Sequence, residues 1–222
     1  ILRGACVHHD NGVLGACTYP EAEERRVRIL KENGYNAIRS SHYPCSKDML
    51  DACDRQGMLM MDEYVDVWYI HKTKYDYAGY LNEWWQQDLK DMVEKDYNHP
   101  CVIMYSTGNE VAETAQKKGI ELTGRMTSYL HKLDPYNFLS SMGMGVYSDD
   151  KAEKSAEIAE QEAKKQEKEK KKPVGSEFYN TLACLVGDYF MKIGATLPPC
   201  DWKTKDAFAN MDIAGYNYGL FR

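Results

Sequence analysis

The sequence has 222 residues, of which 43% are hydrophobic and 12% are aromatic, so it can bury a sizeable core and fits one large domain better than several small ones. Its formal charge of −6 provides no basic face for nucleic acid, and it lacks the run of about 18 apolar residues that a membrane span needs. Its seven cysteines form no CxxC pair, which indicates neither a zinc site nor a disulfide framework. We therefore expect a soluble protein in a reducing cytoplasm, with neither nucleic-acid nor membrane partners.

The chain begins with three units in which a short apolar run precedes an amphipathic stretch. The predicted strands are 2–9, 36–41 and 58–65, and the helices that follow them are 21–33, 46–57 and 81–93. Gly34 and Gly57 are placed to end the first two helices, and Ser46 is placed to cap the second. These units predict a strand and helix alternation.

The second half continues the alternation and adds a charged tract. Its predicted elements are a strand at 101–106, a helix at 122–133, and strands at 138–144 and 211–218. Residues 148–173 form a low-complexity insertion in which Glu160 precedes Lys164 by four positions, and Pro173 ends the tract. This pattern predicts a solvent-exposed helix, and a partner-binding arm is the alternative.

Strands that alternate with helices predict a parallel sheet, either an open doubly wound sheet or a (β/α)8 TIM barrel. Polar residues follow nearly every predicted strand, as in barrels, whose catalytic groups come from the ends of many strands. No GxGxxG sequence follows any strand, which argues against an open-sheet oxidoreductase. We therefore predict an α/β fold, an incomplete TIM barrel with about six of its eight strand and helix units.

An Asn-Glu pair, Asn109 and Glu110, directly follows one of the apolar runs. Taken alone, such a pair is typical of a helix N-cap followed by an acid in the first turn. At the mouth of a barrel, a partly buried carboxyl group suits general acid catalysis, because burial raises the pKa of such a group toward neutrality. Glycoside hydrolysis needs one such acid to protonate the leaving oxygen together with a second carboxylate, so in a glycosidase Glu110 would predict a second carboxylate.

Five ordered segments of the chain resemble the glycoside hydrolases of family 2, which include β-galactosidases, β-glucuronidases and β-mannosidases. The segments are "LRGACVHHD" (2–10), "NGYNAIRSSHYP" (33–44), "CDRQGMLMMDE" (53–63), "DYNHPCVIMYSTGNE" (96–110) and "DIAGYNYG" (212–219). The stretch "HHDNGVLGA" (8–16) is most similar to a bacterial subgroup described as β-galactosidases. The resemblance implies a retaining β-galactosidase that acts on terminal β-D-galactosides, with β-glucuronidase and β-mannosidase as alternatives within the family.

The resemblance also implies site residues. Glu110 corresponds to the acid/base, and Asn109 corresponds to the residue that binds the sugar 2-hydroxyl. The other implied substrate-binding residues are His8, Asp10, Arg39, His42 and Tyr218. Asp62 and Glu63 are interpreted as buried hydrogen-bonding or ion-paired residues rather than catalytic ones, and His99 is interpreted as structural.

The Glu-x-His sequence of magnesium-dependent family members is missing after the third strand, so we expect no metal and no other cofactor. The family nucleophile follows strand seven. Glu177, in "VGSEF", follows a lysine-rich tract and precedes the sixth strand, so we expect the nucleophile and strands 7 and 8 to lie beyond Arg222.

Because of these missing parts, we expect the chain to be a fragment of a longer protein and to be inactive alone. We also expect flanking β-sandwich domains in the full-length protein. The open sheet edges would favour association, which leaves a homo-oligomer open. A non-catalytic carbohydrate-binding barrel and a scaffolding protein built around the charged helix are the alternatives from other functional classes.

Overall fold

The computed structural model describes residues 1–135, 140–144 and 198–217. The chain divides into two compact units. The first comprises Ile1–Asp66, Trp85–Asn109 and Arg125–Ser141, and the second comprises Val67–Trp84, Glu110–Gly124 and Met142–Arg222. The predicted charged helix at 148–173 lies outside the described residues. Among the helices that are described, none is both long enough and apolar enough to cross a membrane.

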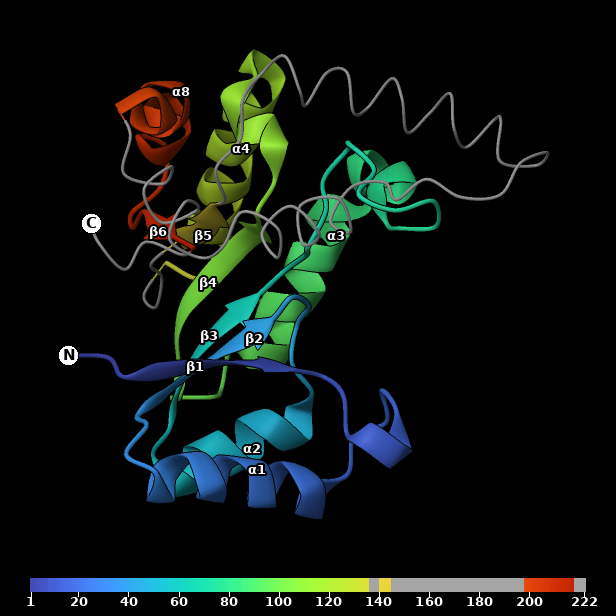
Figure 1. Ribbon diagram of the computed structural model, residues 1–222, viewed down its shortest axis with the longest axis vertical. Coiled ribbons are helices and arrows are strands. Elements are labelled where there is room, and N and C mark those ends of the chain that lie inside the picture. The colour runs from blue at the N-terminus through green and yellow to red at the C-terminus, as the bar shows by residue number, and fades with distance from the viewer. Residues whose placement is uncertain (136–139, 145–197, 218–222) are drawn as a thin grey trace, which may run out of the picture. The chain divides into compact units, whose positions relative to one another are not determined.

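A parallel sheet forms the centre of the first unit (Figure 1). Its strands are β1 (Gly4–His8), β2 (Ala37–Ser41), β3 (Leu59–Glu63) and β4 (Val102–Asn109), and they lie side by side in chain order. Gly4 pairs with Ala37, Ala37 with Leu59, and Met60 with Val102, each in parallel register. The predicted parallel sheet is confirmed.

Strand β4 is longer than predicted, because it continues past Ser106 to Asn109. The backbone N–H of Asn109 donates to the carbonyl of Val65 at 3.2 Å, and Tyr64 N–H donates to Ser106 at 2.8 Å. Backbone pairing next to β3 therefore carries β4 up to the residue that precedes Glu110.

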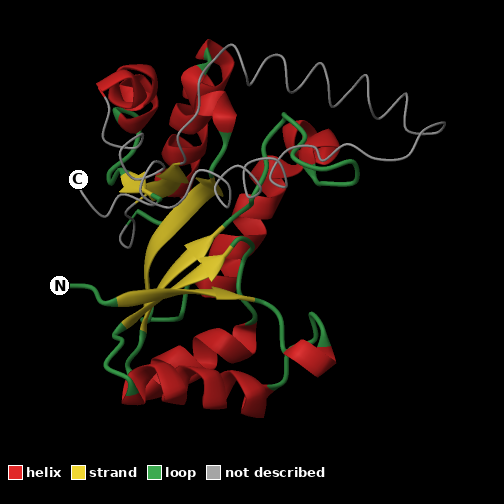
Figure 2. Cartoon of the chain, viewed as in Figure 1, coloured by secondary structure: helices red, strands yellow, loops and turns green. Residues whose placement is uncertain are grey.

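Helices α1 (Pro20–Glu32) and α2 (Lys47–Gln56) lie side by side along the sheet of the first unit. Figure 2 shows these helices in red and the strands of the sheet in yellow. Helix α2 begins as predicted, because the side chain of Ser46 accepts the N–H of Met49 at 3.2 Å. It ends at Gly57, whose φ of 64° lies in the left-handed region that glycine adopts without a Cβ clash. The sequence signals for this helix are confirmed at both ends.

Neighbouring residues of β2 and β3 send their side chains to opposite faces of the sheet. Arg39 bonds to Glu63 on one face, and Ser40 donates to Asp62 on the other at 2.7 Å. Asp62 also accepts the Cys45 N–H at 2.8 Å and the Lys95 ammonium at 3.1 Å. Lys95 belongs to α3 (Ala78–Asp96), so Asp62 links the sheet to the helix that precedes β4.

A second acid, Asp96, shares this buried site. Lys95 contacts one oxygen of Asp96, while the other oxygen is buried and has no hydrogen-bond partner. Burial, followed by the negative charge of Asp62, raises the pKa of Asp96 to about 8. Lys95 lowers it, but by less. The site therefore holds two carboxyl groups and one ammonium group, and the raised pKa of Asp96 favours its protonated form.

The free energy of unfolding is expected to fall as the pH rises from about 4 to about 8, because folded Asp96 binds a proton that the unfolded chain has already released. Each pKa unit corresponds to about 1.4 kcal/mol. In Asp96→Asn, which stays neutral at every pH, this part of the pH dependence should disappear. Urea unfolding at several pH values measures it, with exposed Asp91→Asn as the control. Identical slopes in wild type and Asp96→Asn would contradict the assignment.

Besides Val67–Trp84, which include the first turns of α3, the second unit contains two of the segments that follow β4. Its described elements are η2 (Ala112–Ala115), the first turns of α4 (Lys117–Leu133), the end of β5 (Ser140–Met144), α8 (Pro198–Phe208) and β6 (Gly215–Tyr216). Strand β6 pairs in parallel with β5 through Gly143 and Gly215. It is shorter than predicted, because the N–H groups of Asn210 and Met211 instead close the end of α8.

Candidate functional site

The carboxylate of Glu63, at the end of β3, connects three strands of the first unit. It is fully buried, and Arg39 from β2 donates to its Oε2 from Nε at 2.8 Å and from Nη2 at 2.6 Å. His42 Nδ1 lies 2.6 Å from Oε1, and Ser106 from β4 donates its hydroxyl to Oε2 at 2.7 Å. The interpretation of Glu63 as a buried ion-paired residue is therefore confirmed, and it holds two of the predicted site residues in place.

The charge of Arg39 is maintained by this contact. Burial by itself lowers the pKa of Arg39, but the nearby Glu63 carboxylate raises it, and the net shift is upward. Arg39 therefore presents a permanent guanidinium group with fixed donors. The Nη2 group that contacts Glu63 also donates to Asn109 Oδ1 at 2.8 Å.

The two histidines meet beside this cluster. The ring centroids of His8 and His42 lie 5.1 Å apart, with the rings edge to face. His8 is exposed at the end of β1, and His42 is half-buried after β2. The structure therefore brings together four of the predicted site residues within the first unit, namely His8, Arg39, His42 and Asn109.

Asp10 has a different environment from these four. It is exposed in the loop after β1, and its backbone carbonyl accepts a bond from Arg26 at 2.7 Å. Arg26 also donates to the carbonyl of His8 at 3.0 Å and to the side chain of Asn11 at 2.6 Å. Arg26 of α1 thus holds the end of β1, which carries His8, and the following loop, which carries Asp10.

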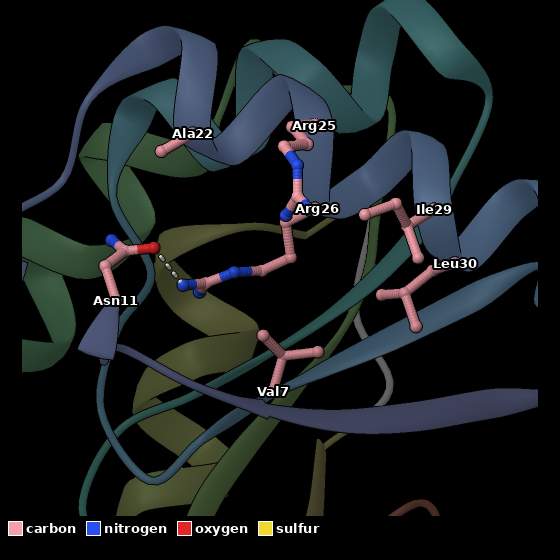
Figure 3. Close-up of a pocket in the computed structure, with 7 residues that line it drawn as sticks. All are labelled: Val7, Asn11, Ala22, Arg25, Arg26, Ile29 and Leu30. Atoms are coloured by element: carbon pink, nitrogen blue, oxygen red, sulfur yellow. Dashed lines mark hydrogen bonds between the residues drawn. The ribbon is translucent and has the colours of Figure 1, made fainter. Parts of the chain in front are cut away.

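Arg26 also borders a hollow of about 420 Å³ next to β1 (Figure 3). The figure shows the Arg26 side chain reaching across to Asn11, with Val7 on the strand side. The lining residues are Val7, Asn11, Ala22, Arg25, Arg26, Ile29 and Leu30. None of them is a predicted site residue, so this hollow does not form part of the candidate catalytic site.

Glu110 follows Asn109 in the chain and is described in the second unit. It is half-buried, and its Oε1 accepts a hydrogen bond from Asn217 Nδ2 at 2.8 Å. Among the described residues other than glycine, Glu110 alone has a positive φ, which is 47°. A left-handed conformation at a non-glycine residue costs conformational free energy and is concentrated at functional sites. The backbone at Glu110 therefore supports the interpretation of a positioned functional carboxylate over that of an ordinary helix first turn.

Three residues that contact the groups described above were absent from the predicted site. Ser106 donates to Glu63, Asp66 accepts from Asn109, and Asn217 donates to Glu110. Ser106 and Asp66 belong to the first unit, and Asn217 belongs to the second. A possible signal for Asp66 was its position as an acid just after the third strand, and one for Asn217 was its position between two tyrosines. The predicted Tyr218 and the disfavoured candidate nucleophile Glu177 lie outside the described residues.

One group in the described part of the chain could hold a metal ion. Asp51 and Asp54 of α2 and His99 before β4 have ligand atoms within 4.8 Å of one another. A hydrogen bond of 2.6 Å between His99 Nδ1 and Asp54 explains this proximity without a metal, as expected for a structural histidine. The absence of a catalytic metal therefore stays a prediction.

Comparison with known proteins identifies the family. The family model described as "Glycosyl hydrolases family 2, TIM barrel domain" matches residues 1–187. The chain belongs to glycosyl hydrolase family 2. The predicted fold class is thereby confirmed, because the parallel sheet described above is the incomplete TIM barrel of this family.

Family 2 relatives and structures show how much of such enzymes the chain represents. β-Galactosidase BoGH2A of Bacteroides ovatus is 52% identical over 112 residues, which are 50% of this chain and 13% of that protein. A putative β-glucuronidase of Formosa agariphila is 33% identical over 141 residues, with coverages of 63% and 13%. A family 2 crystal structure from Bacteroides cellulosilyticus aligns with a TM-score of 0.71 and 33% identity, over 99% of this chain and 21% of that one.

Proposed function

We propose that the chain is the acid/base part of a retaining β-galactosidase that cleaves terminal β-D-galactosides. The observation that carries the proposal is the position of Glu110 in this family 2 chain, directly after Asn109 at the carboxyl end of β4. In a parallel barrel, the carboxyl ends of the strands form the active-site face. The 52% identity to a named β-galactosidase supports the choice of sugar.

In the proposed mechanism, Glu110 donates a proton to the departing glycosidic oxygen and later removes one from the attacking water. Asn217, which donates to Glu110 Oε1, would orient the carboxyl group during both steps. Asn109 would bind the sugar 2-hydroxyl, where hydrogen bonds strengthen as the transition state acquires oxocarbenium character. His8, His42 and Asp10 would line the sugar pocket, together with Tyr218.

Retention needs a second carboxylate that forms the covalent glycosyl-enzyme intermediate. We propose that a segment of the full-length protein outside this chain supplies it, and that Arg39 orients it with a charge-assisted bond. The 222-residue chain alone would then be inactive. The flanking β-sandwich domains, a possible homo-oligomer and the cytoplasmic location are further predictions about the full-length protein.

Hydrolysis of four aryl glycosides by the full-length protein tests the proposal. The panel comprises the β-galactoside, β-glucuronide, β-mannoside and β-glucoside, and the β-galactoside should have the highest kcat/KM. A preference for the β-glucuronide would favour the second candidate, which the similarity to the putative β-glucuronidase supports. Release of β-configured sugar would support retention. Sugar binding without turnover of any glycoside would instead support a non-catalytic binding barrel.

A further inference from the structure

The side-chain amide of Asn109 is held at both ends within the first unit. Arg39 Nη2 donates to its oxygen at 2.8 Å, and its nitrogen donates to Asp66 Oδ1 at 2.8 Å. Asn109 is 4% exposed, so these bonds form away from bulk water. The Asn109 N–H also donates to the backbone carbonyl of Val65, and this bond places Asp66, the next residue, beside the end of β4.

The chemistry of the two partners allows only one orientation of this amide. A guanidinium group has only donors, and an ionised carboxylate has only acceptors. If the amide were flipped, its NH2 group would face Arg39 and its oxygen would face Asp66, and both hydrogen bonds would be lost. Arg39 is in turn anchored by two bonds to buried Glu63. The Asn109 oxygen therefore faces a fixed cation, and its nitrogen is the end that can donate to a hydroxyl group.

We propose that Asp66 is a positioning residue for recognition of the sugar 2-hydroxyl, acting through Asn109. This inference rests on the proposed function, which assigns the 2-hydroxyl contact to Asn109. Asp66 accepts one N–H of the amide and so sets the plane in which the nitrogen donates. Loss of Asp66 removes the hydrogen bond that the amide nitrogen donates to Asp66 Oδ1, so the donor would be less firmly oriented when the transition state forms.

The proposal predicts a loss that depends on the 2-hydroxyl. In the full-length enzyme, Asp66→Ala should lower kcat/KM for an aryl β-galactoside by about 10- to 100-fold, the size expected for a hydrogen bond to a charged group. For the corresponding 2-deoxy-galactoside, which has no hydroxyl to recognise, the loss should be less than about 3-fold. Asp66→Asn keeps an oxygen that can accept the amide N–H and should recover part of the activity. Asp91→Ala, which removes an exposed acid of α3, is the control and should match wild type.

Equal losses on both substrates would overturn the proposal, because a purely structural effect does not distinguish them. Unchanged activity on both would also overturn it. Failure of the proposed function has a different signature, namely a wild-type enzyme that hydrolyses no glycoside of the panel. In that case, calorimetric binding of galactose and 2-deoxygalactose still tests Asp66. Asp66→Ala should weaken galactose binding alone, and equal affinities in wild type and variant would overturn the proposal.

Discussion

Glu110→Gln in the full-length enzyme is expected to lower kcat/KM by about 10²–10⁴-fold for glycosides with poor leaving groups, such as alkyl galactosides. The amide keeps the size of the side chain and can still accept the Asn217 hydrogen bond seen at Glu110 Oε1, but it cannot donate the proton that an alkoxide leaving group needs. The dinitrophenolate group of a dinitrophenyl galactoside can depart without being protonated, so kcat/KM for that substrate should fall far less. Steady-state rates over a series of leaving groups measure the difference.

The matched control is Glu121→Gln, which makes the same chemical change on an exposed position of α4 and should leave both rates unchanged. Added azide should restore the second step in Glu110→Gln, because a small anion needs no general base to attack the glycosyl-enzyme. A uniform loss across leaving groups would argue against an acid role for Glu110. Normal turnover of alkyl galactosides would exclude it.

Glu63→Gln is expected to lower the free energy of unfolding by about 3–5 kcal/mol, because breaking a buried ion pair leaves an uncompensated charge. The substitution removes the carboxylate that faces Arg39 and puts an NH2 group in place of one of its oxygens, either Oε1 beside His42 or Oε2, which accepts from Arg39 and Ser106. Urea unfolding followed by tryptophan fluorescence measures the loss. Activity should fall as well, since Arg39 would lose the anchor that fixes its position.

Glu24→Gln provides the control for this second prediction. Glu24 pairs with Arg55 on the surface at 2.6 Å, where water screens the interaction, so the urea midpoint should hardly change. If Glu63→Gln behaved like Glu24→Gln, the Glu63 cluster would contribute little to stability. The role given to Glu63 as the anchor of Arg39 would then be wrong.

The sequence was sufficient to predict the fold and the proximity of several polar residues, for physical reasons. Apolar periodicity and local signals such as Ser46 and Gly57 act over a few residues, so they can be read directly and the structure confirms them. Arg39 lies within β2, His42 follows it and Asn109 ends β4, and parallel strands bring their carboxyl ends to one edge of a sheet. The sequence could therefore predict that these residues lie close together in the first unit, although not which atoms are in contact.

The contacts between these residues were harder to predict, because they depend on strand register and side-chain direction. The β3 register places Glu63 opposite Ser106 and its neighbour Asp62 opposite Tyr105. Two adjacent acids thereby acquire separate partners on opposite faces of the sheet. Asp66 was missed because it follows the strand, where no periodic pattern applies, and its link to Asn109 arises only from the extension of β4.

The register of the first unit also bears on how the chain folds. Each strand pairs with the next one in the sequence, as Gly4 does with Ala37 and Ala37 with Leu59. The paired residues are about 20 to 40 positions apart, and a doubling of such a loop costs only about 0.6 kcal/mol of closure entropy. Both neighbours of β2 and both neighbours of β3 are close in the sequence, so pairing can advance from β1 toward β4 while the ribosome is still synthesising this part of the chain. The growing edge of the sheet is then covered by each newly made strand soon after it emerges.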